Sequence, residues 1–255
     1  MLKVRDLRVF FKSGSKVVRA LDGVSLDVLS GRITAVVGSS GSGKSVLALS
    51  MLRLIEKPGW IEGGSIELDG KEILAFGERE LRDYRGRGTA MIFQDPSGSM
   101  DPVSKVKNHL FEAARTPRLS RGRAMEDFRR ILTRVGLKDP EKVLESYPFE
   151  LSGGMCQRVM VAMGLASRAK VLIADEPTSS LDLTTQAAIL EEFRRLRDLG
   201  LTMVLITHDL GVVAQTADDV YVLHDGRVIE GGPVEQVLTS PREAFTRSLL
   251  VSVSV

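Results

Sequence analysis

The segment GSSGSGKS, residues 38–45, is the strongest candidate for chemistry in this 255-residue chain. It matches the pattern G-x-x-x-x-G-K-[ST] between an apolar run, 33–38, and a helix predicted for 44–55. Lys44 would reach the β- and γ-phosphates of a nucleotide, and the Ser45 hydroxyl would ligate Mg²⁺. The expected phosphate-binding residues are Gly38, Ser39, Ser40, Gly41, Ser42, Gly43, Lys44 and Ser45. A flexible Gly/Ser loop is the alternative.

Two carboxylates, Asp175 and Glu176, end the apolar run VLIADE. Because burying unpaired carboxylates is costly, we expect a metal ion or a polarised water to compensate them. Asp175 would organise Mg²⁺, and Glu176 would orient or deprotonate an attacking water. A solvated acidic loop is the simpler alternative.

Gln94 and His208 also end continuous apolar runs, TAMIFQ and TMVLITH. A lone histidine is more often structural than functional. However, ligands of an open parallel sheet bind beyond the carboxyl ends of its strands. We therefore expect these two residues, the carboxylate pair and the Gly/Ser loop to face one crevice.

A second candidate phosphate-binding segment is LSGGMCQRVMVA, residues 151–162. Helix interiors penalise glycine by about 1 kcal/mol relative to alanine. A Ser-Gly-Gly entry to a helix exposes N–H groups and the positive end of the helix dipole. Ser152, Gly153 and Gly154 thus predict an anion-binding helix start, far along the chain from Lys44.

The elements that must position these residues form an α/β pattern. Runs at 4–11, 24–29 and 65–70 predict strands, and alternation in the last two suits antiparallel strands with one solvated face. The four continuously apolar runs predict buried parallel strands covered by helices. Residues 97–166 are Arg-rich with helical patterns only, which indicates a helical insertion, and 183–199 predicts another helix.

Composition limits the function classes. Hydrophobic residues are 43% and charged residues 27%, as in soluble globular proteins, and the net charge of +2 gives no argument for nucleic acid or an anionic membrane. We expect no signal peptide, since the chain opens with MLKVRDLRVFF, which is mixed in charge and too short for one. We expect no membrane span, since no run of about 18 apolar residues exists. The single Cys156 excludes an internal disulfide and a Cys-clustered metal site.

Taken in order, GSSGSGKS, Gln94, LSGGMCQR, VLIADEPTSSLD and Thr207-His208-Asp209 resemble the ATP-binding subunit of an ABC transporter over nearly the whole chain. The resemblance implies a P-loop NTPase core, a mainly parallel sheet flanked by helices, with an antiparallel β lobe and a helical subdomain. One domain would span 1–255, with the core at 1–96 and 167–255 and the helical subdomain at 97–166.

The resemblance also implies roles for single residues. In that family the Ser-Gly-Gly signature contacts the γ-phosphate of ATP held by the other subunit, which would explain the second candidate phosphate-binding segment. Gln94 would be the lid-loop glutamine that senses Mg²⁺ and the membrane partner. His208 would hold the γ-phosphate and the water.

Two implied roles have structural alternatives. Asp182 falls in the family's D-loop but can equally cap the helix predicted at 183–199. Phe11 matches the aromatic residue that stacks on adenine, although the family often has tyrosine there. Phe10 adjoins it, and either ring can belong to the core.

The segments MIFQDPSGSMDPV and SPREAFTRSLL resemble the peptide and nickel import group most closely. This implies an ATPase that drives import through two membrane permeases, paired head-to-tail with a second ATP-binding subunit, identical or paralogous. A solute-binding protein would deliver the cargo, and the subunit would lie peripherally on the cytoplasmic side of the cell membrane. Many peptide-type subunits carry a cysteine-rich tail for an iron–sulfur cluster; we expect no cluster here, which favours nickel-type or compact dipeptide-type subunits.

Two alternatives to an importer remain. A soluble ABC-type ATPase acting on nucleic acid or ribosomes usually has tandem ATPase domains or long coiled-coil insertions, and a basic surface. An exporter's ATPase often shares its chain with membrane helices. Since the sequence has none of these features, we expect no nucleic-acid partner. The cargo itself is open, because cargo does not touch this subunit.

Overall fold

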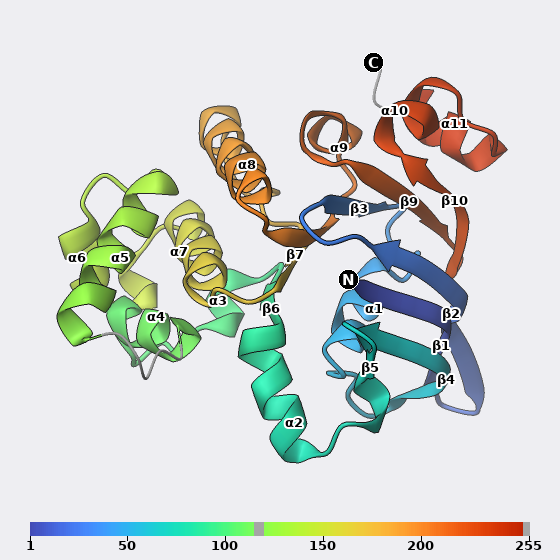
Figure 1. The fold of residues 1–255 in the computed structure, drawn as a ribbon, viewed down its shortest axis with the longest axis horizontal. Helices are drawn as coiled ribbons and strands as arrows, with labels where there is room; N and C mark the ends of the chain where they lie inside the picture. The colour runs from blue at the N-terminus through green and yellow to red at the C-terminus, as the bar shows by residue number, and fades with distance from the viewer. Residues whose placement is uncertain (115–119, 252–255) are drawn as a thin grey trace. The chain divides into compact units, whose positions relative to one another are not determined.

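The computed structural model describes residues 1–114 and 120–251 (Figure 1). The chain forms two compact units, each described here separately. The first unit comprises Met1–Arg82 and Arg197–Val255, and the second unit comprises Asp83–Leu196. The helical subdomain expected at 97–166 falls inside the second unit, and its boundaries stay a prediction.

An antiparallel sheet occupies the beginning of the first unit. Its strands are β1 (Leu2–Ser13), β2 (Lys16–Val28), β4 (Gly59–Leu68) and β5 (Lys71–Glu72), in the order β2-β1-β4-β5. Leu2 and Val4 are fully buried whereas Arg5 is exposed, so one face of the sheet is solvated as predicted. β2 begins well before the predicted strand because residues 16–19 pair with the end of β1 in an exposed hairpin that lacks apolar alternation.

A mixed sheet follows in the first unit. Its strands there are β3 (Ile33–Val37), β8 (Thr202–Ile206), β9 (Asp219–His224) and β10 (Arg227–Pro233), in the order β10-β9-β3-β8. β3 runs parallel to β8 and β9, and β10 runs antiparallel to β9. Every residue of β3 and β8 is buried, which is why both read as continuous apolar runs.

Helices complete the first unit: η1 (Ile73–Ala75), α1 (Lys44–Met51), α9 (Leu210–Thr216), α10 (Val234–Thr239) and α11 (Ala244–Val251). Val213 of α9 and Val237 of α10 pack with Val37 and Val222 of the mixed sheet. α1 is shorter than the predicted helix 44–55, because Arg53 adopts a left-handed conformation (φ 52°) that ends it.

The second unit is mostly helical. Two parallel strands, β6 (Thr89–Ile92) and β7 (Val171–Asp175), pair within it. Its helices are η2 (Tyr84–Gly88), α3 (Pro96–Ser99), α4 (Val106–Ala114), α5 (Arg121–Arg134), α6 (Pro140–Glu145), η3 (Pro148–Glu150), α7 (Gly153–Ala166) and α8 (Leu183–Asp198). Helix α2 (Glu78–Asp83) ends at Asp83, the first residue of the second unit. The described part of 97–166 contains helices and no strand, as predicted.

Helix α7 lies directly against the two strands of the second unit. A Cβ atom added to its Gly164 would lie 2.8 Å from Ile92 Cγ1 on β6 and 3.1 Å from Leu172 Cδ1 on β7. Both neighbouring side chains are buried. Glycine at this position therefore sets how closely the helix approaches the strands.

We expect Gly164→Val to lower the free energy of unfolding by about 1–3 kcal/mol, because added methyl groups overpack a buried contact. Gly122→Val is the matched control: a Cβ at Gly122 of α5 meets nothing within 4 Å. Its effect should stay within about 0.5 kcal/mol, the difference in helix propensity between the two residues. Urea unfolding measures both, and equal losses would contradict the packing described.

Candidate nucleotide-binding site

The loop at 38–45 joins the buried end of β3 to the start of α1 in the first unit. Added Cβ atoms would lie 2.1 Å from the Leu223 carbonyl oxygen at Gly38 and 2.6 Å from the Ala20 carbonyl oxygen at Gly43. Gly41 and Gly43 have φ values of 78° and 105°, in the region that favours glycine. The loop path thus depends on glycine, and it leaves Ser39, Ser40 and Gly41 exposed while Ser42 is buried.

Lys44 and Ser45 occupy the first turn of α1. The Lys44 ammonium donates hydrogen bonds to the carbonyl oxygens of Gly38 and Ser39, both at 2.9 Å, so it lies over the loop. The Ser45 side chain is exposed. Since the first turn of α1 has no acidic side chain, the positive end of the helix dipole remains available to an anion.

His208 lies in the link between β8 and α9. Asp209 caps α9 by accepting hydrogen bonds from the backbone N–H groups of Gly211 and Val212, at 2.8 and 3.1 Å. β8 is parallel to β3, and the Thr207 N–H donates to the Val36 carbonyl oxygen at 3.3 Å. The exposed His208 therefore leaves the sheet at the same edge as the loop at 38–45.

In the second unit, the carboxylate pair follows β7. Asp175, 3% exposed, is the last residue of that strand, and Glu176 is 8% exposed. β6 is parallel to β7, with Ile92 opposite Ala174, so the exposed Gln94 leaves at the same edge as Asp175. Glu176 has φ 49°, a left-handed conformation that costs a residue other than glycine about 1–2 kcal/mol. Such strain concentrates at functional sites.

The signature segment begins α7. Ser152 is the N-cap, and its Oγ accepts a hydrogen bond from the Met155 N–H at 3.3 Å. A Cβ on Gly153 would meet nothing within 4 Å, and one on Gly154 would only contact Leu181 at 3.6 Å. No described part of the chain therefore requires these two glycines, which fits the close approach of a group from outside it.

Asp182 caps helix α8. Its Oδ1 accepts a hydrogen bond from the Thr185 N–H at 3.0 Å, and its Oδ2 accepts one from the Thr185 hydroxyl at 2.7 Å. These bonds hold the pKa of the exposed Asp182 carboxyl below its usual range. The structural role is thus present, and the D-loop role stays a prediction.

Comparison with known proteins assigns the family. The family model described as ABC transporter matches residues 21–179. The chain belongs to the ABC transporter family. The sequence-based expectations of an ABC-type ATPase and of a P-loop NTPase fold with an antiparallel β lobe and helical parts are therefore confirmed.

Individual relatives of this ABC cassette agree with the family assignment. It is 47% identical to the peptidoglycan transport ATP-binding protein YejF of Agrobacterium fabrum, over 99% of this chain and 47% of that protein. It is 41% identical to the oligopeptide transport ATP-binding protein OppD of Bacillus subtilis, over 99% of this chain and 72% of that protein. The chain thus spans about half the length of YejF.

A solved structure shows the same fold. The bacterial ABC transporter cassette MJ0796, solved as a dimer, aligns with a TM-score of 0.84 and 25% identity, over 92% of this chain and 99% of that one. MJ0796 has also been solved in a post-hydrolysis state bound to ADP and Pi, with a TM-score of 0.82.

Phe10 and Phe11 have different surroundings in this cassette. Phe10 makes an edge-to-face contact with Trp60, ring centroids 6.1 Å apart, and the Arg19 guanidinium lies 5.6 Å from the Phe10 ring. The half-buried Phe11 ring lies against Gly59, where a Cβ would come within 2.5 Å of Phe11 Cε1. Phe10 is therefore engaged in a cross-strand cluster, and the adenine-stacking role of Phe11 stays a prediction.

The sequence analysis did not single out Gln157. This residue of α7 is fully buried, and its Nε2 donates a hydrogen bond of 2.8 Å to the carbonyl oxygen of Pro177, next to Glu176. A glutamine within the apolar stretch of a helix is the sequence signal that could have identified it.

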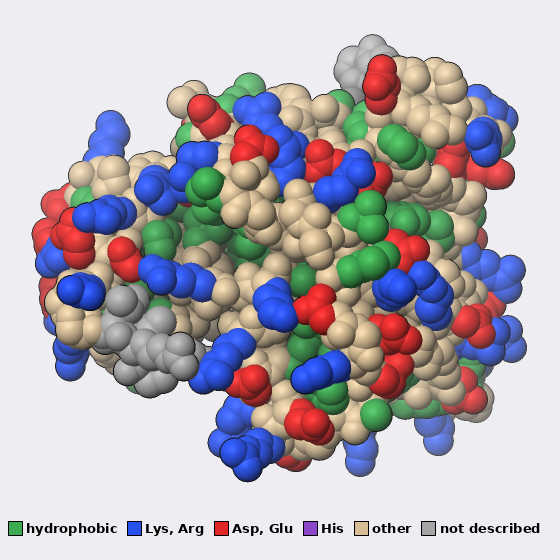
Figure 2. Space-filling model, viewed as in Figure 1, with side chains coloured by type: hydrophobic (Ala, Val, Ile, Leu, Met, Phe, Trp, Pro, Cys, Tyr) green, Lys and Arg blue, Asp and Glu red, His purple; other side chains and the backbone are tan. Residues whose placement is uncertain are grey.

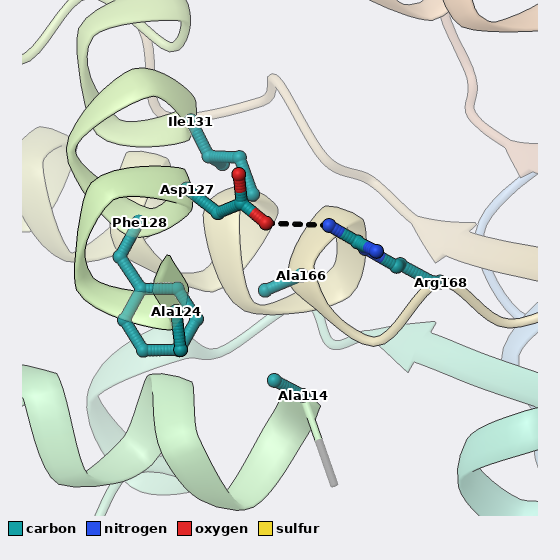
Figure 3. Close-up of a pocket in the computed structure, with 7 residues that line it drawn as sticks. All are labelled: Ala114, Ala124, Asp127, Phe128, Ile131, Ala166 and Arg168. Carbon is teal, nitrogen blue, oxygen red and sulfur yellow. Dashed lines mark hydrogen bonds and ion pairs between the residues drawn. The ribbon is translucent and has the colours of Figure 1, made fainter. Parts of the chain in front are cut away.

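A small pocket of the second unit is lined by residues of α4 and α5, by the last residue of α7 and by Arg168 (Figure 3). Ala114, Ala124, Phe128, Ile131 and Ala166 line it together with Asp127 and Arg168. The charged groups of Asp127 and Arg168 form an ion pair with each other at 2.5 Å. The pocket therefore presents an apolar lining and a compensated charge pair, which do not suit a nucleotide phosphate.

Lys44→Ala should weaken ATP binding roughly 10-fold or more, because a charge-assisted contact worth about 1.5–3 kcal/mol is lost. Titration calorimetry measures the Kd. Lys16→Ala, which removes an exposed charge of the same unit from β2, is the control and should leave the Kd unchanged. An unchanged Kd for Lys44→Ala would mean that this loop does not bind the nucleotide.

Proposed function

We propose that this ABC cassette is the ATP-hydrolysing subunit of a bacterial importer that moves peptides through separate membrane permeases. The observation that carries the proposal is 41–47% identity over 99% of the chain to ATP-binding proteins named for oligopeptide and peptidoglycan transport. A glutathione import ATP-binding protein of Escherichia coli is 40% identical over the same share. Nickel, the other cargo implied by the sequence, is the alternative.

The loop at 38–45 binds the phosphates of ATP in this proposal, and Phe11 stacks on adenine. The oxygen atoms of Ser45, Gln94 and Asp175 suit Mg²⁺, which prefers hard oxygen ligands and usually takes one or two carboxylates plus substrate phosphates. Bound Mg²⁺ would neutralise charge developing on the phosphates.

Glu176 is the residue that we propose to activate the attacking water. Its carboxylate would orient the water and accept its proton, and His208 would hold the water and the γ-phosphate. Gln94 would link the occupancy of the Mg²⁺ site to the permease. Burial and a strained backbone at Glu176 support a defined orientation for its carboxylate.

Glu176→Gln keeps the shape of the side chain and removes the base, so turnover should fall by about 10²–10⁴. The ATP Kd should change little, because the phosphate loop is intact. Glu191→Gln, an exposed position on α8, is the control and should hydrolyse ATP at the normal rate. Steady-state phosphate release measures both, and near-normal turnover of Glu176→Gln would remove Glu176 from this role.

The signature segment serves a second ATP-binding subunit in this proposal. Ser152, Gly153 and Gly154 would contact the γ-phosphate of a nucleotide held by that subunit in a head-to-tail pair. Support comes from the glycines that no described part of this chain requires, and from MJ0796, which was solved as a dimer. The second subunit is either identical or a paralogue.

Photo-crosslinking with a γ-phosphate-labelled ATP analogue tests the two-subunit site. Mixed dimers are purified by two tags from a chain carrying Lys44→Ala and a chain with Lys44 intact. The label should join the signature segment of the Lys44→Ala chain, since its partner holds the nucleotide. Gly153→Asp in that chain should remove the label, because a carboxylate repels the γ-phosphate. Labels confined to the chain that keeps Lys44 would contradict the arrangement.

The transport partners are two permeases and, on the far side of the membrane, a solute-binding protein. In the proposal this subunit is peripheral on the cytoplasmic side of the cell membrane. No helix in the described ranges is long and apolar enough to cross a bilayer.

A soluble ABC-type ATPase acting on nucleic acid or ribosomes, or an exporter's ATPase, would use the same nucleotide chemistry. Nucleic-acid binding calls for a basic stripe. On the face shown in Figure 2, acidic and basic side chains are interspersed. Co-purification separates these functions: membrane proteins would support the transporter, and a nuclease-sensitive association would support the nucleic-acid alternative.

A further inference from the structure

Gln157 connects the signature helix to the turn that carries Glu176, both within the second unit. It lies in α7, four residues after Gly153, and is fully buried. Its Nε2 donates a hydrogen bond of 2.8 Å to the carbonyl oxygen of Pro177, which directly follows Glu176. A side chain of one element thus holds the backbone of another, 20 residues away in sequence.

The orientation of this amide is fixed by chemistry. A carbonyl oxygen only accepts hydrogen bonds, so the nitrogen of Gln157 must face Pro177 and the oxygen must face elsewhere. Gln157 Oε1 is buried, and within the described ranges it has no hydrogen-bond partner. A buried acceptor without a partner is unfavourable for stability. Stability alone therefore does not explain glutamine here, where methionine would fill the same space.

The turn beside Gln157 needs such support. Glu176 is held at φ 49°, and strain of this kind persists only where the surroundings impose it. Within the turn, the N–H and hydroxyl of Ser179 donate to the Glu176 carbonyl oxygen at 3.4 and 3.2 Å. From α8, Gln186 reaches the Thr178 hydroxyl at 3.4 Å. The contact from Gln157 is shorter than any of these.

We propose that Gln157 is a positioning residue: its N–H fixes Pro177 and so holds Glu176 in the orientation required for hydrolysis. This inference rests on the proposed role of Glu176. In the same proposal, the start of α7 touches the nucleotide of the second subunit, and Glu176 activates the attacking water. Gln157 therefore links the helix that carries the signature segment to the turn that carries the proposed base.

Two substitutions remove the Gln157 hydrogen-bond donor and replace it with apolar side chains of different shape. Gln157→Met keeps the length of the side chain, and Gln157→Leu changes it to a branched one. In both, kcat for ATP hydrolysis should fall about tenfold or more, the scale expected when a reacting group is misplaced. KM should stay within about twofold, since the phosphate loop is intact. The melting temperature of Gln157→Met should stay within about 3 °C, because the unpaired oxygen disappears together with the hydrogen bond.

Cys156→Ala is the matched control. Cys156 is the neighbouring buried residue of α7, and its Sγ donates to another proline carbonyl, that of Pro148, at 3.4 Å. Its kcat should stay within about twofold of the unmodified chain, since that bond lies away from Glu176 in sequence. Hydrogen exchange of the backbone at 176–181 should be faster in Gln157→Met than in Cys156→Ala.

Each outcome is decisive. The inference would be overturned if kcat were unchanged in one or both Gln157 variants. Unfolding of Gln157→Met would also overturn it. A large kcat loss in Cys156→Ala would do the same, because any defect in α7 would then suffice. Glu176→Gln in the same assay separates the two claims: if it hydrolyses ATP normally, the proposed function fails, and the exchange result alone decides whether Gln157 holds the turn.

Discussion

Phosphate binding by backbone N–H groups is the constraint on which the proposed site depends. The start of a helix offers such groups to an anion when no side chain stands in the way. The chain provides this twice, at the loop before α1 and at the start of α7, and neither first turn contains an acidic residue. The reason for glycine differs between the two segments. A side chain at Gly38 or Gly43 would clash with backbone atoms of the same chain, whereas Gly153 faces open space.

Parallel strands position the other residues of the proposed site. β3 and β8 in the first unit, and β6 and β7 in the second unit, each present their carboxyl ends at a common edge. Because these strands are short and largely buried, they are rigid anchors for exposed ends such as Gln94 and His208. These strand ends therefore cannot shift without disturbing the buried core.

Local chemistry made much of this fold predictable. β3, β7 and β8 lie within their predicted apolar runs, since burial on both faces leaves a continuous signal, and Asp182 caps α8 as its position suggested. The early end of α1 at Met51 and the φ of Glu176 were not predictable, because tertiary contacts override local preference there. A glutamine in an apolar stretch could have drawn attention to Gln157, but its contact with Pro177, 20 residues away in sequence, was not predictable.

The central claim is that the two helix starts bind different nucleotides in a pair of subunits. Sedimentation of the Glu176→Gln chain with Mg²⁺ and ATP tests it most directly, together with the co-purifying ATPase if the chain does not pair with itself. The account predicts a mass that doubles when ATP is added, and no doubling when Gly153→Asp is introduced into both members of the pair. ATP-dependent doubling that survives Gly153→Asp would contradict it.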